Sequence, residues 1–307
     1  FAKLNYSEQL TEIPGNITLT DFYTRPRYSR TPEDFGTEKV NAITIGSENI
    51  LDSGNKFSNV FKFEDKDQTT SALSGGRYIL AKTNLETSTL SSKLTKKQRF
   101  NNLDLKSKLG VDFFNSAYRA IGNDWYQNKY HNIASQNIIE PFGIFEFNHS
   151  SNEKIDYEIG FRYHYYELDT DNYTTKTSLS SDDRQNYAWS LGANYNLQNG
   201  QKLFTHVSRA YRSPRLDEII SLIKPSPSHT HIKHQYSNDI ELGYEVNVER
   251  KSYKASIFRT LIKNQIYLNQ TTLKNENFDP SIHQGLEIEF DQSINDKLNL
   301  KSNATFI

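Results

Sequence analysis

The sequence contains no cysteine and no methionine among its 307 residues. Without Cys, this chain cannot build a disulfide framework, a thiolate metal site or a cysteine nucleophile. Because Met is absent even at position 1 and no signal peptide is recognisable, we expect an internal or mature fragment of a longer reading frame. The formal net charge is only −1, from 36 basic and 37 acidic residues. A near-neutral chain offers no overall field for nucleic acid, and we expect no nucleic-acid partner.

Long apolar runs are lacking too. The mean hydropathy is −0.75, and no stretch of about 18 apolar residues could form a transmembrane helix. These absences do not exclude a membrane β-barrel, because its lumen face and outer loops are polar. Aromatic residues make up 13% of the chain, with 19 Tyr and 18 Phe. Such a composition suits β-strands and the aromatic girdles of a barrel.

Apolar residues instead recur at every second position, most clearly between residues 204 and 290. In the block YSNDIELGYEVNVE (236–249), Ile240, Leu242 and Tyr244 alternate with charged or small residues. The segments 103–113, 155–166 and 187–197 follow the same pattern. Side chains alternate across a strand, so each segment has one apolar and one polar face. Alternation over about 9–11 residues is the length that a membrane-crossing strand requires.

Short and long connections alternate along the chain. We predict short turns near 52–55, 150–154, 196–200, 249–252 and 291–296, and long loops at 212–235 and 269–282. We also expect polar loops at 65–76 and around 125–131, a Ser/Thr/Lys-rich turn after residue 86, and no regular structure in the breaker-rich segment after Leu10. About thirteen strands result, and single-chain bacterial barrels have an even number. The fold class predicted is therefore all-β, a transmembrane antiparallel barrel in which residues 1–307 form one part of a larger barrel and Ile307 lies inside a strand.

Several motifs resemble those of one family. SRAYRSPRLDEI (208–219) is similar to a stretch of TonB-dependent outer-membrane receptors in which an aromatic residue, Arg, a small residue and Pro precede a Leu and an acidic residue. YSNDIELGYE resembles the following strand of these receptors at Ser237, Glu241, Leu242 and Gly243. The run from Asn264 to Glu287 resembles the next hairpin of ferric-siderophore-type members, and IPGNITLTDFYTRPRYS (13–29) resembles one of their outer loops.

The resemblance implies a receptor of the Gram-negative outer membrane that binds a ferric siderophore or similar iron chelate and imports it with energy from the TonB complex. Its partners would be the chelate, TonB and outer-membrane lipid. The family's amino-terminal plug domain and TonB box have no counterpart in this sequence, nor do its last strands, so we expect that this segment alone does not carry out gated uptake. No cofactor and no catalytic residue is expected, and the chain is not predicted to be an enzyme.

Candidate ligand-binding residues fall in the outer loops. Arginines beside Tyr23 and Tyr28 could hold an anionic chelate by charge and stacking. Histidines in the loop after Pro214 could ligate haem iron or another metal, although exposed histidines in a polar loop need no such role. No metal site is certain. The candidate set is Arg25, Arg27, Arg30, Trp125, Tyr126, Arg212, His229, His231 and His234.

Other functions remain open at this stage. Haem and cobalamin receptors share the motifs quoted above. A passive porin-like channel would have the same strands without a plug. A soluble all-β surface protein would instead pack residues such as Leu103, Val111, Tyr157 and Tyr187 against a second sheet. Lumen-facing charges, including Arg162, Glu158, Asp156 and His164, are expected to be structural.

Overall fold

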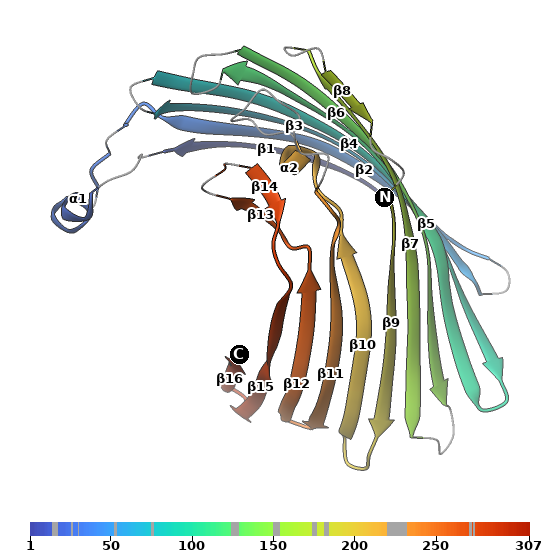
Figure 1. Cartoon of the computed structure of the whole chain (residues 1–307). Coiled ribbons are helices and arrows are strands. Elements are labelled where there is room, and N and C mark those ends of the chain that lie inside the picture. The colour runs from blue at the N-terminus through green and yellow to red at the C-terminus, as the bar shows by residue number, and fades with distance from the viewer. Residues whose placement is uncertain are drawn as a thin grey trace.

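A computed structural model of the chain describes residues 1–13, 18–25, 27–29, 31–51, 54–74, 77–123, 129–149, 154–173, 177–180, 184–219, 232–269, 272 and 274–307. One curved sheet dominates, drawn as an open arc in Figure 1. Its strands are β1 (Ala2–Glu12), β2 (Phe35–Ile50), β3 (Lys56–Ser74), β4 (Arg77–Phe100), β5 (Leu103–Asn123), β6 (Lys129–His149), β7 (Ile155–Asn172), β8 (Thr177–Ser180), β9 (Arg184–Asn196), β10 (Gln201–Arg212), β11 (Gln235–Val248), β12 (Lys251–Lys263), β15 (Ser281–Asn295) and β16 (Leu298–Phe306). The remaining elements are α1 (Leu19–Thr24), α2 (Leu216–Ile219) and the hairpin β13 (Ile266–Asn269) with β14 (Lys274–Asn277).

Thirteen strands follow one another across the sheet in the order β1 to β7, β9 to β12, β15 and β16, and β8 pairs with the outer part of β7. Every neighbouring pair is antiparallel. The predicted fold class, an antiparallel barrel wall of about thirteen strands, is therefore confirmed. Among the described residues, neither helix is long or apolar enough to cross a membrane.

The two ends of the sheet differ in their connections. The segments between β4 and β5, β9 and β10, β11 and β12, and β15 and β16 are tight turns; we call this the turn end. The long segments between β1 and β2, β10 and β11, and β12 and β15 lie at the other end, which we call the loop end (Figure 1). Asn101, Asn199 and Glu249 adopt positive φ in the tight turns, as two-residue hairpins favour. The predicted alternation of short and long connections holds for these segments, but at the loop end only two residues separate β3 from β4, where a long polar loop was predicted.

The sheet is apolar on its convex face and polar on its concave face. In β11, Ile240, Leu242 and Tyr244 are exposed, whereas Glu241 between them is half-buried. A water-soluble sheet shows the reverse, because burial of apolar area stabilises it. Exposed apolar side chains recur on the same face of β5, β7, β9, β12 and β15. A convex face of this kind is suited to contact with lipid.

Several predicted loops are strands. Residues 65–74 continue β3, β4 runs on through the supposed turn after residue 86 to Phe100, and His131 lies within β6. Residues 65–71 are polar on both faces, so alternation cannot reveal them, whereas in β4 the exposed Leu90 and Leu94 lie on the convex face among Ser, Thr and Lys residues that were interpreted as a turn. The register of these strands is set by neighbouring strands and by cross-strand contacts such as the 2.7 Å ion pair between Lys66 and Glu38. The segment after Leu10 also contains regular structure, the helix α1, capped by the Thr18 side chain on the Asp21 amide.

Candidate functional site

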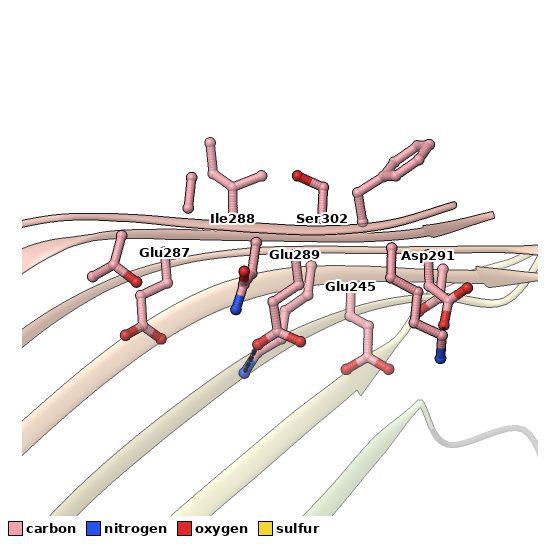
Figure 2. A pocket seen from close by; sticks show the side chains of 13 residues that line it. Glu245, Glu287, Ile288, Glu289, Asp291 and Ser302 are labelled. Carbon is pink, nitrogen blue, oxygen red and sulfur yellow. Dashed lines mark ion pairs between the residues drawn. The ribbon is translucent and has the colours of Figure 1, made fainter. Parts of the chain in front are cut away.

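Charged side chains line the concave face of the sheet. Figure 2 shows Glu245, Glu287 and Glu289 on one side of β11 and β15, with Ile288 on the opposite side. A hollow of about 710 Å³ lies along this face, and Lys254 and Lys301 line it as well. Many of the charges are paired across strands, including Lys202 with Glu245 at 2.9 Å. Lys106 and Lys108 both bind Glu146, at 2.7 and 2.6 Å. The concave face therefore offers a polar wall to whatever occupies the lumen.

One network on this wall, which we call the Glu140 network, is more buried than the rest. The Glu140 carboxylate is 13% exposed and lies opposite His164 on the neighbouring strand. Arg162 donates from Nη1 to Glu140 Oε2 at 2.6 Å and to Asp112 Oδ2 at 2.7 Å. Tyr211 donates its hydroxyl to Glu140 Oε1 at 2.8 Å. Four strands, β5, β6, β7 and β10, are thus joined through one carboxylate and one guanidinium.

His164 extends the Glu140 network to the connection between β10 and β11. Its Nδ1 lies 2.7 Å from Glu140 Oε1 and its Nε2 lies 2.7 Å from Ser213 Oγ. A carboxylate only accepts, so Nδ1 carries hydrogen, and in the neutral imidazole Nε2 accepts from the Ser213 hydroxyl. Ser213 Oγ is also 3.0 Å from His234 Nδ1, at the far end of the same connection. Ser213 therefore links the two ends of this long connection to each other and to the imidazole of His164, which is only 2% exposed.

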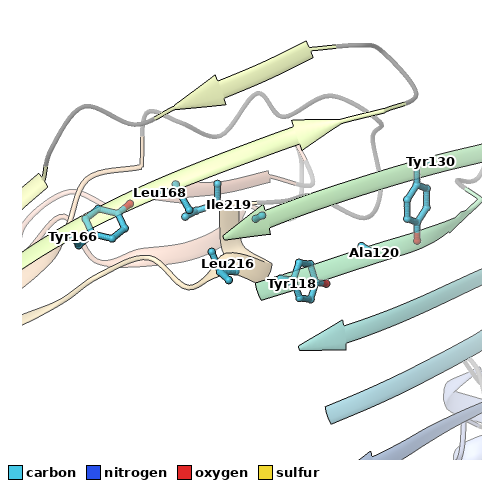
Figure 3. Packing of buried hydrophobic residues seen from close by; sticks show 8 residues of the cluster. Tyr118, Ala120, Tyr130, Tyr166, Leu168, Leu216 and Ile219 are labelled. Atoms are coloured by element: carbon cyan, nitrogen blue, oxygen red, sulfur yellow. The ribbon is translucent and has the colours of Figure 1, made fainter. Parts of the chain in front are cut away.

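An apolar cluster holds the same connection against the lumen wall. The helix α2 folds back onto the inner side of β5, β6 and β7, as Figure 3 shows. Leu216 and Ile219 are 4% and 3% exposed, and burial of each stabilises the docked segment by about 1.5–3 kcal/mol. The cluster consists of Tyr118, Ala120, Tyr130, Ala134, Tyr166, Leu168, Leu216 and Ile219. The motif SPRLDEI therefore builds an inward-folded segment of the loop end.

Two candidates from the sequence, Arg212 and His234, lie at this inward-folded segment. Arg212 forms an ion pair with Glu218 two residues into α2. Glu218 also accepts the Arg215 amide at 2.9 Å. Arg212 thus fixes the bend between β10 and α2, and His234 belongs to the Glu140 network.

Arg25 and Arg27 belong to a different part of the loop end. Both are exposed, and α1 lies beyond the sheet, apart from α2 (Figure 1). Arg25 pairs with Asp21 and stacks on the Tyr28 ring at 4.2 Å. The Arg25 guanidinium holds the pKa of the Asp21 carboxyl below its usual value. Arg30, Trp125, Tyr126, His229 and His231 lie outside the described residues.

The two residues at the centre of the Glu140 network, Glu140 and His164, were not among the predicted site residues. Glu140 was not singled out, and His164 was expected to be a structural lumen charge. One signal was available: the turn at 150–154 places both on the polar face of one hairpin, opposite each other. In the described part of the chain, no three His, Cys, Asp or Glu side chains gather as a metal site.

Comparison with known proteins shows which family this β-sheet resembles. The sequence profile "TonB dependent receptor-like, beta-barrel" matches residues 3–307. No curated protein matches the sequence. Among solved structures, the unliganded ferric citrate transporter FecA is 14% identical with a TM-score of 0.81, over 95% of this chain and 44% of FecA. The ferric-catecholate import receptor Fiu from E. coli is 15% identical with a TM-score of 0.70, over 99% of this chain and 55% of Fiu.

Receptors with other named cargoes are similar too. The Serratia marcescens hemophore receptor HasR is 13% identical with a TM-score of 0.70, over 95% of this chain and 49% of HasR. The copper transporter OprC is 14% identical with a TM-score of 0.68, over 88% of this chain and 46% of OprC. The chain spans about half the length of these structures, and identities this low show the fold alone. Since the profile covers nearly the whole chain, the protein belongs to the TonB-dependent receptor-like β-barrel family.

Proposed function

We propose that this chain forms part of the barrel wall of an outer-membrane receptor that imports a ferric siderophore, with the energy for import supplied through TonB. The observation that carries the proposal is the sidedness of the sheet, apolar outside and charged inside, in a chain of this family. Several structural neighbours are named for ferric citrate, ferric-catecholate and ferric yersiniabactin. Transport requires no chemistry on the cargo, so the lumen groups position and release the ligand rather than react with it.

The inward-folded segment suits the role of a ligand-responsive element. It joins the loop end to the lumen wall through groups that have discrete partners, namely Ser213, His164 and Glu140. A ligand shifts such an element only by binding one of its positions better than the other. A chelate seated among the outer loops would contact this segment directly, whereas the turn end lies at the opposite side of the sheet.

The loop arginines differ in how available their charges are to bind an iron chelate. Arg25 is already neutralised by Asp21, and Arg212 is paired with Glu218. Arg27 is exposed three residues after the end of α1, and Tyr23 within α1 is 74% exposed. A cation and an exposed ring together suit an anionic, aromatic iron chelate. We therefore assign first contact to Arg27 and Tyr23, and a positioning role to Arg212.

Iron uptake by the full-length receptor tests the proposal. Cells that lack their own receptors would express the complete gene and be supplied with radioactive iron as ferric citrate, a ferric catecholate or haem, and separately with copper. We expect uptake of a ferric siderophore that disappears when TonB is deleted. The Arg27→Gln, Tyr23→Ala variant should take up iron more slowly at low chelate concentration, whereas Lys56→Gln at the turn end should not. Uptake without TonB would indicate a passive channel, and transport of haem or copper alone would overturn the siderophore assignment.

A further inference from the structure

The convex face of β9 to β12 and β15 carries charge of one sign only. The register places Arg209, Lys251, Arg259 and Lys263 on this face, in line with Leu191, Ile240 and Leu286. Not one Asp or Glu occupies a convex position of these five strands, because their carboxylates all fall on the concave side. Within the described part of the chain, no carboxylate forms an ion pair with any of the four cations.

Three of these cations gather near the loop end, among aromatic rings. Arg209 lies between two tyrosines, with its guanidinium carbon 4.5 Å from the Tyr187 centroid and 4.3 Å from that of Tyr236. Lys263 Nζ is 5.9 Å from the same Tyr236 ring. Arg259 is exposed and lies two residues nearer the middle of the sheet than the level of Arg209. Stacking occupies the faces of a guanidinium and leaves its in-plane N–H donors for another group.

An apolar belt separates this cluster from the turn end. Between the cations, the convex positions of β10, β11 and β12 are Leu203, Thr205, Val207, Ile240, Leu242, Tyr244, Val246, Tyr253, Ala255 and Ile257. Lys251 and Lys263 are the first and last residues of β12, so they lie about 40 Å apart along the strand and about 28 Å apart along the axis of a barrel tilted by 45°. That separation matches the hydrocarbon thickness of a bilayer. Lys263 therefore lies at the height of lipid headgroups, and Arg209 and Arg259, which lie nearer the belt, reach the headgroups with the ends of their long side chains.

We propose that Arg209, Arg259 and Lys263 form a binding site for the phosphate of an anionic glycolipid in the outer leaflet. Long loops face outward in bacterial barrels, so the loop end lies in that leaflet. Each cation beside an anionic membrane surface gains about 1 kcal/mol from the attraction, and arginine binds phosphate in a bidentate manner. Tyr187 and Tyr236 pack beside the sugar and acyl chains, as interfacial tyrosines do. The site rests on the outer-membrane placement proposed above and is independent of the cargo.

Lipid retention by the purified full-length receptor tests this site. The receptor would be placed in phosphatidylcholine nanodiscs that contain diphosphoryl lipid A or its dephosphorylated form, and bound lipid would be counted by native mass spectrometry. We expect retention of the phosphorylated form, reduced about tenfold or more in Arg209→Gln, Lys263→Gln. The matched control is Lys251→Gln, on the same face and strand at the turn end, which should retain lipid as the wild type does.

Loss of the ring stack could disturb folding of the double variant, so Arg259→Gln provides a second test. Arg259 is exposed and contributes no cation–π contact, and its replacement should reduce retention severalfold. Equal retention by these variants and the wild type, equal loss in Lys251→Gln, or full competition by millimolar inorganic phosphate would each overturn the proposal. The measurement does not involve transport, so failed iron uptake would leave it standing, and failed lipid binding would leave the uptake assignment intact.

Discussion

Replacing Glu140 by Gln removes one charge from the centre of the lumen wall while nearly preserving its shape. Glu140 accepts from Arg162, His164 and Tyr211 at 2.6, 2.7 and 2.8 Å. Glutamine keeps one acceptor oxygen and adds an NH₂ group, which must face at least one of these donors. We expect the inward-folded segment to loosen, because the orientation of His164 toward Ser213 depends on Glu140.

The magnitude follows from the bonds that are lost. A guanidinium cannot accept a hydrogen bond, so the amide oxygen faces Arg162 and the NH₂ group takes the place of Oε1, opposite the His164 Nδ1–H and the Tyr211 hydroxyl. At least one hydrogen bond to the charged carboxylate is then lost, worth about 1.5–3 kcal/mol, and two donors are opposed at His164. Arg162 retains its 2.7 Å bond to Asp112, so the cost remains below that of an isolated buried charge. A loss of about 2–3 kcal/mol would raise the undocked fraction of the segment about thirtyfold or more.

A spin label on α2 measures this undocking. The sequence contains no cysteine, so Asp217→Cys introduces a single labelling site in this chain, at a side chain that is 53% exposed. We expect Glu140→Gln to increase the mobility of the label. The control is Glu146→Gln on the same strand and face, whose lysine partners are about one-third exposed and can be replaced by water; its cost should be about 0–1 kcal/mol. Equal label mobility in both variants would refute a docking role for the Glu140 network.

Three further outcomes are expected. Gly243→Val should destabilise the barrel by about 1–3 kcal/mol in urea unfolding, because the new Cβ overlaps the Phe204 ring on β10, and Phe204→Ala should restore part of the loss. Ile257→Lys on the convex face should cost about 2–4 kcal/mol of insertion free energy in folding assays with lipid vesicles, whereas Ser256→Ala on the concave face should not. The Asp21 carboxyl has a pKa below its unfolded value, so its support of α1 is present above the usual Asp pKa of about 3.9 and is lost as pH falls through the lowered value. A nitroxide at Tyr23→Cys should therefore gain mobility only at strongly acid pH, and Asp21→Asn should show that mobility at neutral pH.

The sequence was most informative where a strand crosses the membrane. Alternation is imposed there by lipid on one face and the lumen on the other, so the predicted segments 103–113 and 155–166 lie within β5 and β7, and 236–249 runs one residue beyond the end of β11. Above the bilayer both faces meet water, and residues such as Asp65 and Asp67 extend β3 without an apolar partner. Their strand state depends on pairing with β2 and β4, which no local pattern encodes.

The functional site was less predictable than the fold for a related reason. Arginines and histidines in loops attract attention because they are exposed, yet Arg25 and Arg212 are already paired within their own segments. His164 and Ser213 are 49 residues apart, and only the return of the chain after Pro214 brings them together. Gly243 is a partial exception. It was recognised as part of a motif, and the structure supplies the reason, since only a residue without Cβ fits under Phe204.

Charge placement on the two faces connects these findings. On the concave face, cations and carboxylates alternate and pair across strands, as between Lys202 and Glu245, so the wall is polar without a strong net field. On the convex face of β9 to β12 and β15, carboxylates are excluded and cations occur only near the two ends of the apolar belt. Mere tolerance of charge at an interface would admit Asp and Glu as readily as Lys and Arg, because both are solvated there. A surface with cations and no carboxylates is instead expected if the surroundings are themselves anionic. Arg209, which is held between the Tyr187 and Tyr236 rings, is the position where we most expect an anion to bind.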